Sequence, residues 1–84
     1  MYVLVGSVTT AMRFKRLLEQ IASAPCDVVH TPSQLHNGGC SYSVRLDNKY
    51  LGTAKTISDE YGINIRKIFL DELVGGERIY HAVP

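Results

Sequence analysis

The amino-acid sequence predicts an α+β fold with the element order strand, helix, strand, strand, helix, strand. Two segments, residues 8–22 and 47–62, carry apolar residues at the three- and four-residue spacing of an amphipathic helix. Short runs of β-prone residues lie before, between and after these two segments. At 84 residues, the chain is long enough for one domain with a single core.

The first strand is expected at residues 2–5, where apolar residues follow one another without alternation, as in a covered central strand. Ser7 is a suitable N-cap for the first helix, because its hydroxyl can accept a hydrogen bond from a backbone N–H of the first turn. Pro25 ends the helical pattern. One apolar stripe of this helix is expected to face the core, formed by Ala11, Phe14, Leu17, Leu18 and Ile21.

The second strand is expected at residues 26–30. The third is expected at residues 41–46, where apolar and polar residues alternate more cleanly than anywhere else in the chain. Between them, residues 31–39 form a connection longer than most hairpins need, which indicates a functional loop.

The second helix is expected to begin at Asp47-Asn48, and Gly62 stands where a helix-ending glycine belongs. The fourth strand is expected in the second half of residues 63–70. Residues 71–84 have two interpretations: an extra strand or hairpin after the glycine pair 75–76, or a disordered or partner-docking tail.

This element order is that of the ferredoxin-like fold, whose antiparallel sheet has the strand order 4-1-3-2. Right-handed crossovers make strands 1 and 2 parallel and strands 3 and 4 parallel, with both helices on one face. We therefore expect a ferredoxin-like domain at residues 1–70, followed by residues 71–84. The sheet face away from the helices is expected to be bare and available for a dimer, a partner or a ligand.

The charge balance does not indicate a nucleic-acid-binding surface, since the chain has nine basic and eight acidic residues and no clustered basic face is evident. No apolar run approaches the roughly 18 residues that span a bilayer. The first residues lack the basic segment of a signal peptide. We therefore expect a cytoplasmic protein that binds neither nucleic acid nor membrane, with both cysteines as thiols.

Cys40 is the candidate functional residue, because it directly follows Gly38 and Gly39 in the long loop. Glycines at such a place allow a ligand or another chain to approach the backbone closely. In the expected sheet, the start of the third strand lies beside the end of the first, and so near Ser7 and the N-terminus of the first helix. The partial positive charge there would stabilise a thiolate and lower the pKa of Cys40. His30 and His36 are candidate partners of the thiolate.

Cys26 is expected at the opposite end of the sheet, because it begins the second strand. A five-residue strand would separate its sulfur from that of Cys40 by roughly 15 Å, at about 3.3 Å per residue. That distance is beyond disulfide reach, so no Cys26–Cys40 bond is expected. Cys26 is expected to be a small buried hydrophobic residue.

The sequence also resembles a small bacterial family of selenium/sulfur carrier-like proteins over roughly residues 2–70. The resemblance rests on a strand followed by Ser7 opening a helix, then Pro32, then Gly39-Cys40 starting a strand. It implies that Cys40 carries sulfur or selenium as a persulfide or perselenide and passes it to a partner protein. Ser7, Pro32 and Gly39 match the framework of the family, whereas the two histidines come from the geometry alone.

Several interpretations stay open. Cys40 could be an ordinary surface cysteine, or one ligand of a metal site with His30 and His36, although that spacing matches no standard zinc pattern. A full catalytic site would need a base with an orienting partner, and no such triad is evident. A second functional class is a non-catalytic ferredoxin-like module that dimerises or binds a partner through the bare face, with Tyr42 or Val44 in the contact.

The carrier interpretation is our sequence-based prediction. It requires no cofactor and no metal. It implies donor and acceptor proteins for sulfur or selenium as partners, with a homodimer left as an open alternative.

Overall fold

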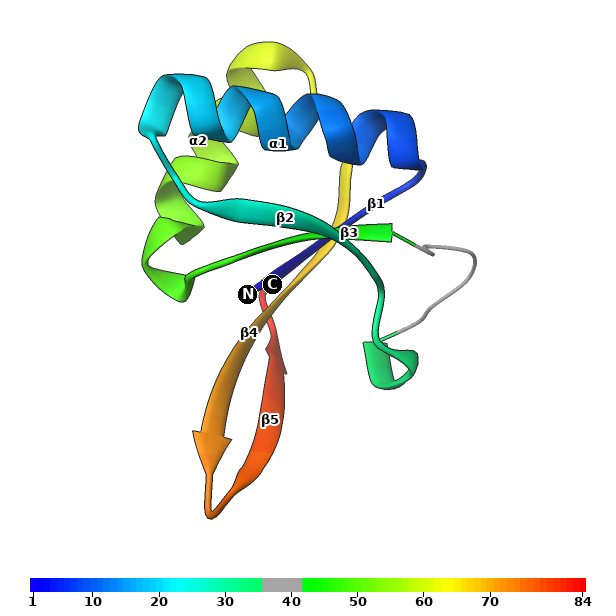
Figure 1. Ribbon diagram of the computed structural model, residues 1–84, viewed down its shortest axis with the longest axis vertical. Coiled ribbons are helices and arrows are strands. Elements are labelled where there is room, and N and C mark those ends of the chain that lie inside the picture. Colours follow the sequence, from blue (N-terminus) through cyan, green and yellow to red (C-terminus); the bar gives the residue numbers. More distant parts are fainter. Residues whose placement is uncertain (36–41) are drawn as a thin grey trace.

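The structure is a computed structural model and describes residues 1–35 and 42–84 (Figure 1). It has the predicted two helices, and the predicted four strands are followed by a fifth. Among the described residues, no helix combines the length and the apolar character needed to cross a membrane. The elements are β1 (Tyr2–Val5), α1 (Val8–Ala22), β2 (Cys26–His30), the 3₁₀ turn η1 (Ser33–Leu35), β3 (Tyr42–Leu46), the 3₁₀ turn η2 (Asn48–Tyr50), α2 (Leu51–Tyr61), β4 (Ile65–Val74) and β5 (Glu77–Ala82).

The five strands form one antiparallel sheet with the order β2-β3-β1-β4-β5. The predicted order 4-1-3-2 is present within this arrangement, and β5 adds a strand outside β4. Both helices lie on the same side of the sheet in Figure 1. The central strand β1 pairs with β3 on one side and with β4 on the other, so it fixes the register of both neighbours.

The main core lies between the helices and the sheet. Phe14 and Leu18 of α1 are completely buried there, together with Val3 of β1. Ala54 and Ile57 of α2 close the same cluster. Val44, expected on a bare sheet face in the binding-module interpretation, is instead buried in this cluster, and Tyr42 packs against it.

The opposite face of the sheet is not bare, contrary to the prediction. Tyr2 and Leu4 of β1 project to this face, and Leu35 of η1 packs on them, so that all three are buried. Val29 and Phe69 pack at the margin of this second cluster. Leu35, which follows β2, therefore covers part of this face, and the sequence pattern of strands and helices does not predict this contact.

The predicted start of α1 and the predicted end of α2 are confirmed. The Ser7 hydroxyl accepts a hydrogen bond from the Thr10 backbone N–H at 3.1 Å and caps α1. Gly62 ends α2 with a φ of 67°, the left-handed conformation that glycine adopts without strain. Asp47 differs from the prediction, because its carboxylate caps η2 by accepting from the Lys49 N–H at 2.9 Å. A 3₁₀ turn therefore precedes α2.

Strand β4 runs past the predicted end at residue 70 and continues to Val74. Gly75 and Gly76 then form a tight turn into β5, with φ values of 57° and 83°. Positive φ at both central residues is typical of the type I′ turn, which matches the twist of a β-hairpin. Of the two interpretations of residues 71–84, the hairpin is the one found.

Candidate functional site

At the end of the sheet where the chain passes from β1 into α1, the last residues of β1 and β2 and the first residue of β3 lie in one row. Val5, the last residue of β1, faces Tyr42, the first residue of β3. Tyr42 in turn faces His30, the last residue of β2. Adjacent strands lie about 4.8 Å apart, so His30 is two strand spacings from the start of the β1–α1 connection. We call this row and the α1 N-terminus the β3-start end.

His30 is exposed, and its ring packs against the ring of Tyr42, with the centroids 4.9 Å apart and the planes tilted by 33°. Directly beside this pair, the hydroxyls of Thr31 and Ser43 share a buried hydrogen bond of 2.6 Å. This bond holds the chain leaving β2 against β3. His30 is thus placed at the β3-start end by an aromatic contact and a buried polar contact.

Ser7 lies at the same end, where α1 begins. Its hydroxyl is 3.0 Å from that of Thr10, in addition to the hydrogen bond from the Thr10 N–H. The first turn of α1 contains no acidic residue. The partial positive charge of the helix N-terminus is therefore left without a carboxylate from its own first turn.

Replacing Ser7 with alanine is expected to lower the free energy of unfolding by about 1 kcal/mol, because the Thr10 N–H loses its acceptor. Urea denaturation followed by circular dichroism measures this change. Ser7→Asp is the matched control and should keep most of the stability, since a carboxylate caps as well as a hydroxyl. Equal stability of all three proteins would contradict the role of the cap.

A cavity of about 410 Å³ opens beside the α1 N-terminus. Among the described residues that line it, the charged ones are Arg13 and Arg66. Arg13 donates a hydrogen bond from Nη2 to the Tyr61 carbonyl at 2.9 Å. Neither arginine takes part in an ion pair within the described residues. The lining residues are Gly6, Ser7, Thr9, Thr10, Arg13, Gly62, Ile63, Asn64 and Arg66.

The Arg66 guanidinium lies close over the backbone of Gly6. A Cβ atom at position 6 would stand 3.0 Å from Nη2 of Arg66, so the absence of a side chain makes room for the guanidinium. Two guanidinium groups, neither with an ion-pair partner in the part of the chain that the structure describes, and a helix N-terminus give this end a positive potential. Neither arginine was predicted as a site residue. Arg66 lies on β4, which reaches Gly6 only through the register of the sheet.

Cys26 lies at the opposite end of the sheet, as predicted, where it faces Leu46 in the β2–β3 register. It is a free thiol, buried with 8% of its surface exposed, and its Sγ lies 3.7 Å from the Lys15 carbonyl oxygen. Burial raises the pKa of the Cys26 thiol, and nearby Glu19 adds to this effect. Cys26 therefore behaves as a core residue with little thiolate character.

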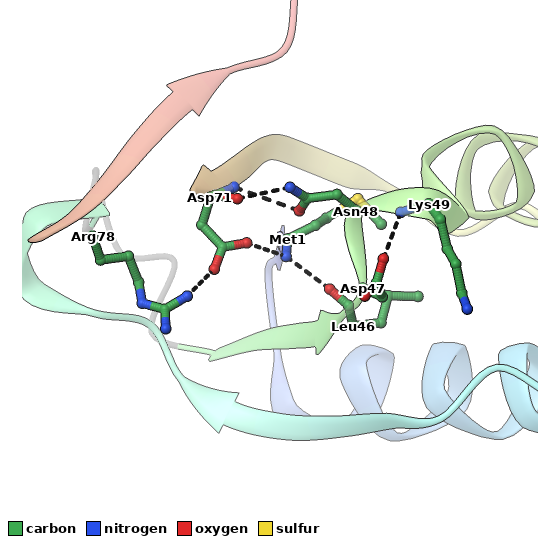
Figure 2. A network of polar contacts seen from close by, with 7 residues as sticks. All are labelled: Met1, Leu46, Asp47, Asn48, Lys49, Asp71 and Arg78. Carbon is green, nitrogen blue, oxygen red and sulfur yellow. Dashed lines mark hydrogen bonds and ion pairs between the residues drawn. The ribbon is translucent and has the colours of Figure 1, made fainter. Parts of the chain in front are cut away.

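A network of polar contacts surrounds Asp71 at that opposite end (Figure 2). The Met1 ammonium donates to the Leu46 carbonyl at 2.7 Å and to Oδ1 of Asp71 at 2.5 Å. Arg78 pairs with the other carboxylate oxygen, and Nδ2 of Asn48 donates to the Asp71 carbonyl at 2.7 Å. A cavity of about 630 Å³ borders this network and Cys26. The network joins residues that are distant in the sequence, so no local pattern predicts it.

Four of the predicted site residues, His36, Gly38, Gly39 and Cys40, lie outside the described residues. The structure brings His30 and Ser7 to the same end of the sheet as the start of β3. Within residues 1–35 and 42–84, no three His, Cys, Asp or Glu side chains are grouped so that they could hold a metal ion. The metal alternative involves His36 and Cys40 and so stays a prediction.

The family model described as "Putative Se/S carrier protein-like" matches residues 1–70 of the chain. The chain belongs to this Se/S carrier-like family. The resemblance seen in the sequence is thereby confirmed. The match includes Cys40 and both helices, while the distal part of the β4–β5 hairpin lies beyond it. Neither the curated proteins nor the solved structures gave a match.

Proposed function

We propose that this protein carries sulfur or selenium on Cys40, as a persulfide or perselenide, and passes it to an acceptor protein. The family match over residues 1–70 carries this proposal, because the matched segment contains Cys40. The only other cysteine, Cys26, is buried in the core, and burial raises the pKa of its thiol. Since the thiolate is the reactive form, Cys26 is poorly suited to the role.

The charges at the β3-start end support a reactive thiol there. Cys40 precedes Tyr42 by two residues in the sequence, and Tyr42 faces the end of β1. We therefore place the working thiolate at this end, where Arg13, Arg66 and the α1 N-terminus provide positive potential. Positive charge and a helix N-terminus lower the pKa of a thiol.

The remaining predicted residues have roles that follow from this placement. Ser7 holds the α1 N-terminus in its capped conformation. His30, and from the loop His36, are proposed partners that pair with the thiolate or protonate it after transfer. Gly38 and Gly39 are proposed to let the donor and acceptor proteins approach the sulfur closely.

The transfer step is a thiolate exchange that consumes no oxidant. The Cys40 thiolate attacks the terminal sulfur of a persulfide on the donor protein, and a bond forms between Sγ and that sulfur. The sulfur–sulfur bond of the donor breaks, and its electron pair leaves with the donor thiolate. Delivery to the acceptor repeats the exchange in the opposite direction and regenerates the Cys40 thiolate. Selenium would follow the same sequence as a perselenide.

The sheet order supports a ferredoxin-like carrier domain formed by residues 1–70, with the end of the hairpin as an addition. We place this carrier in the reducing cytoplasm, where a thiol that must load and unload stays free of structural disulfides. Donor and acceptor proteins are its implied partners.

The proposal is tested by the pH dependence of alkylation, followed by loading with glutathione persulfide and intact mass analysis. Wild-type protein is expected to react with a midpoint well below the usual thiol pKa of about 8.5. It is expected to gain one adduct of about 32 mass units, the mass of one sulfur atom, located on Cys40.

Two variants make this experiment specific. Cys26→Ser is the matched control and should load like the wild type, whereas Cys40→Ser should gain no adduct. An ordinary midpoint with no adduct on Cys40 would overturn the carrier function, and the partner-binding module would become the better interpretation.

A further inference from the structure

Strand β5 forms an open edge of the sheet. In the strand order β5 pairs with β4 alone, so its outward N–H and C=O groups have no partner strand among the described residues. Figure 1 shows the β4–β5 hairpin extending away from the helices. Natural proteins often protect such edges with charged side chains, especially lysine, with proline or with a bulge. β5 carries the charged residues Glu77 and Arg78 at its start but no lysine or proline, and its register with β4 is continuous from Glu77 to Ala82.

The hairpin also exposes large apolar side chains near this edge. Leu73 is 68% exposed, Val74 48% and Ile79 38%. Val74 and Ile79 project to the same face of the hairpin, because Ile79 faces Glu72 and side chains two apart share a face. These residues lie outside the family match, which ends at residue 70. The carrier function therefore does not explain them.

Symmetry restricts how β5 could pair with a second copy of itself. In an antiparallel pair, facing residues alternate between hydrogen-bonded and non-hydrogen-bonded pairs. A two-fold axis between the two strands must map hydrogen-bonded pairs onto hydrogen-bonded pairs, and non-hydrogen-bonded pairs onto non-hydrogen-bonded pairs. This is satisfied only when the axis passes midway between one residue and the same residue of the second copy. Within β5 the candidate centres near the middle are Arg78, Ile79 and Tyr80.

The charges of β5 favour one of these three centres. With the axis at Ile79, Glu77 faces His81 of the second copy, and Arg78 faces Tyr80. His81 and Arg78 keep their pairs with Glu72 and Asp71 of their own chain, and no two like charges face each other across the axis. With the axis at Arg78, two guanidinium groups face each other. With the axis at Tyr80, Glu77 faces an apolar residue beyond the end of β5.

We propose that two copies of this chain dimerise by antiparallel pairing of their β5 strands, centred on Ile79, to form one continuous sheet of ten strands. The occupant of the open edge is thus a second copy of the chain. The two Ile79 side chains meet at the axis, and the exposed Val74 side chains lie on the same face nearby. The proposal does not rest on the chemistry of Cys40.

Disulfide trapping tests the register directly. Ile79→Cys in the Cys26→Ser, Cys40→Ser background is expected to give a covalent dimer on mild oxidation, because each new thiol faces its own copy. Val74→Cys in the same background is the matched control, since Val74 is at least as exposed as Ile79 on the same hairpin but lies on β4, away from the axis. It is expected to form little covalent dimer.

Sedimentation of the untagged wild-type chain over a range of concentrations provides the second measurement. The wild type is expected to reach twice the monomer mass, and Ile79→Lys to stay monomeric with an unchanged circular dichroism spectrum. A wild type that stays monomeric at every concentration would overturn the proposal and leave the edge to a different partner. Equal trapping of Ile79→Cys and Val74→Cys would overturn the register.

Discussion

Replacing Phe14 with alanine is expected to destabilise the protein by about 3–5 kcal/mol. Phe14 is completely buried and is the largest of the fully buried side chains, packed between α1 and the sheet. Its removal loses the favourable free energy of burying the aromatic ring and leaves a cavity that the surrounding side chains fill only in part. Domains have stabilities of roughly 0.05–0.15 kcal/mol per residue, so this loss is a large share of the total.

Urea denaturation followed by circular dichroism measures the effect of Phe14→Ala. Met12→Ala is the matched control on the same helix, because Met12 is 51% exposed and its truncation should change stability by less than about 0.5 kcal/mol. A loss below about 1 kcal/mol for Phe14→Ala would show that α1 does not pack on the sheet as described.

The second large effect is expected for Asp71→Asn, which should cost about 2 kcal/mol at neutral pH, the usual value of hydrogen bonds to charged groups. The Asp71 carboxylate is the shared partner of Arg78 and of the ammonium of Met1, a residue with 2% of its surface exposed. The substitution removes the negative charge and leaves the ammonium with the Leu46 carbonyl as its remaining acceptor in the network. A buried charge without its counter-charge is unfavourable.

The contribution of Asp71 to the free energy of unfolding depends on pH, and the direction of its pKa shift determines how. Burial raises the pKa of Asp71, but the hydrogen bonds and positive charges of the Met1 ammonium and Arg78 outweigh it, so the pKa is lowered in the folded protein. A carboxyl group with a lowered folded pKa stabilises the fold above its unfolded pKa of about 3.9. That contribution is lost as the pH falls from there through the folded pKa.

The urea stabilities of wild type and Asp71→Asn should therefore differ at pH 7 and converge in strong acid. Glu72→Gln is the matched control, because Glu72 pairs with His81 on the exposed surface, where ion pairs contribute little. A constant difference between wild type and Asp71→Asn at all pH values would contradict the linkage.

The local elements of this protein could be predicted from the amino-acid sequence. The spacing of Ala11, Phe14 and Leu18 predicted the buried face of α1, although Ile21 of the same predicted stripe is 49% exposed. Ser7 and Gly62 marked helix ends that the structure confirms. These predictions succeed because a helix face and a helix cap depend on residues within one or two turns. The order of Ser7, Pro32 and Gly39-Cys40 along the chain likewise indicated the family.

Which distant residues meet depends on the tertiary structure. The fourth strand was expected to end by residue 70, yet β4 continues to Val74 and pairs there with β5. Within this continuation, the Asp71 carboxylate pairs with the Met1 ammonium and with Arg78. In the same way, Leu35 covers a face expected to be bare, and Arg66 reaches Gly6 across the sheet. Each of these contacts depends on the register between strands, and register is set by the packing of the whole domain.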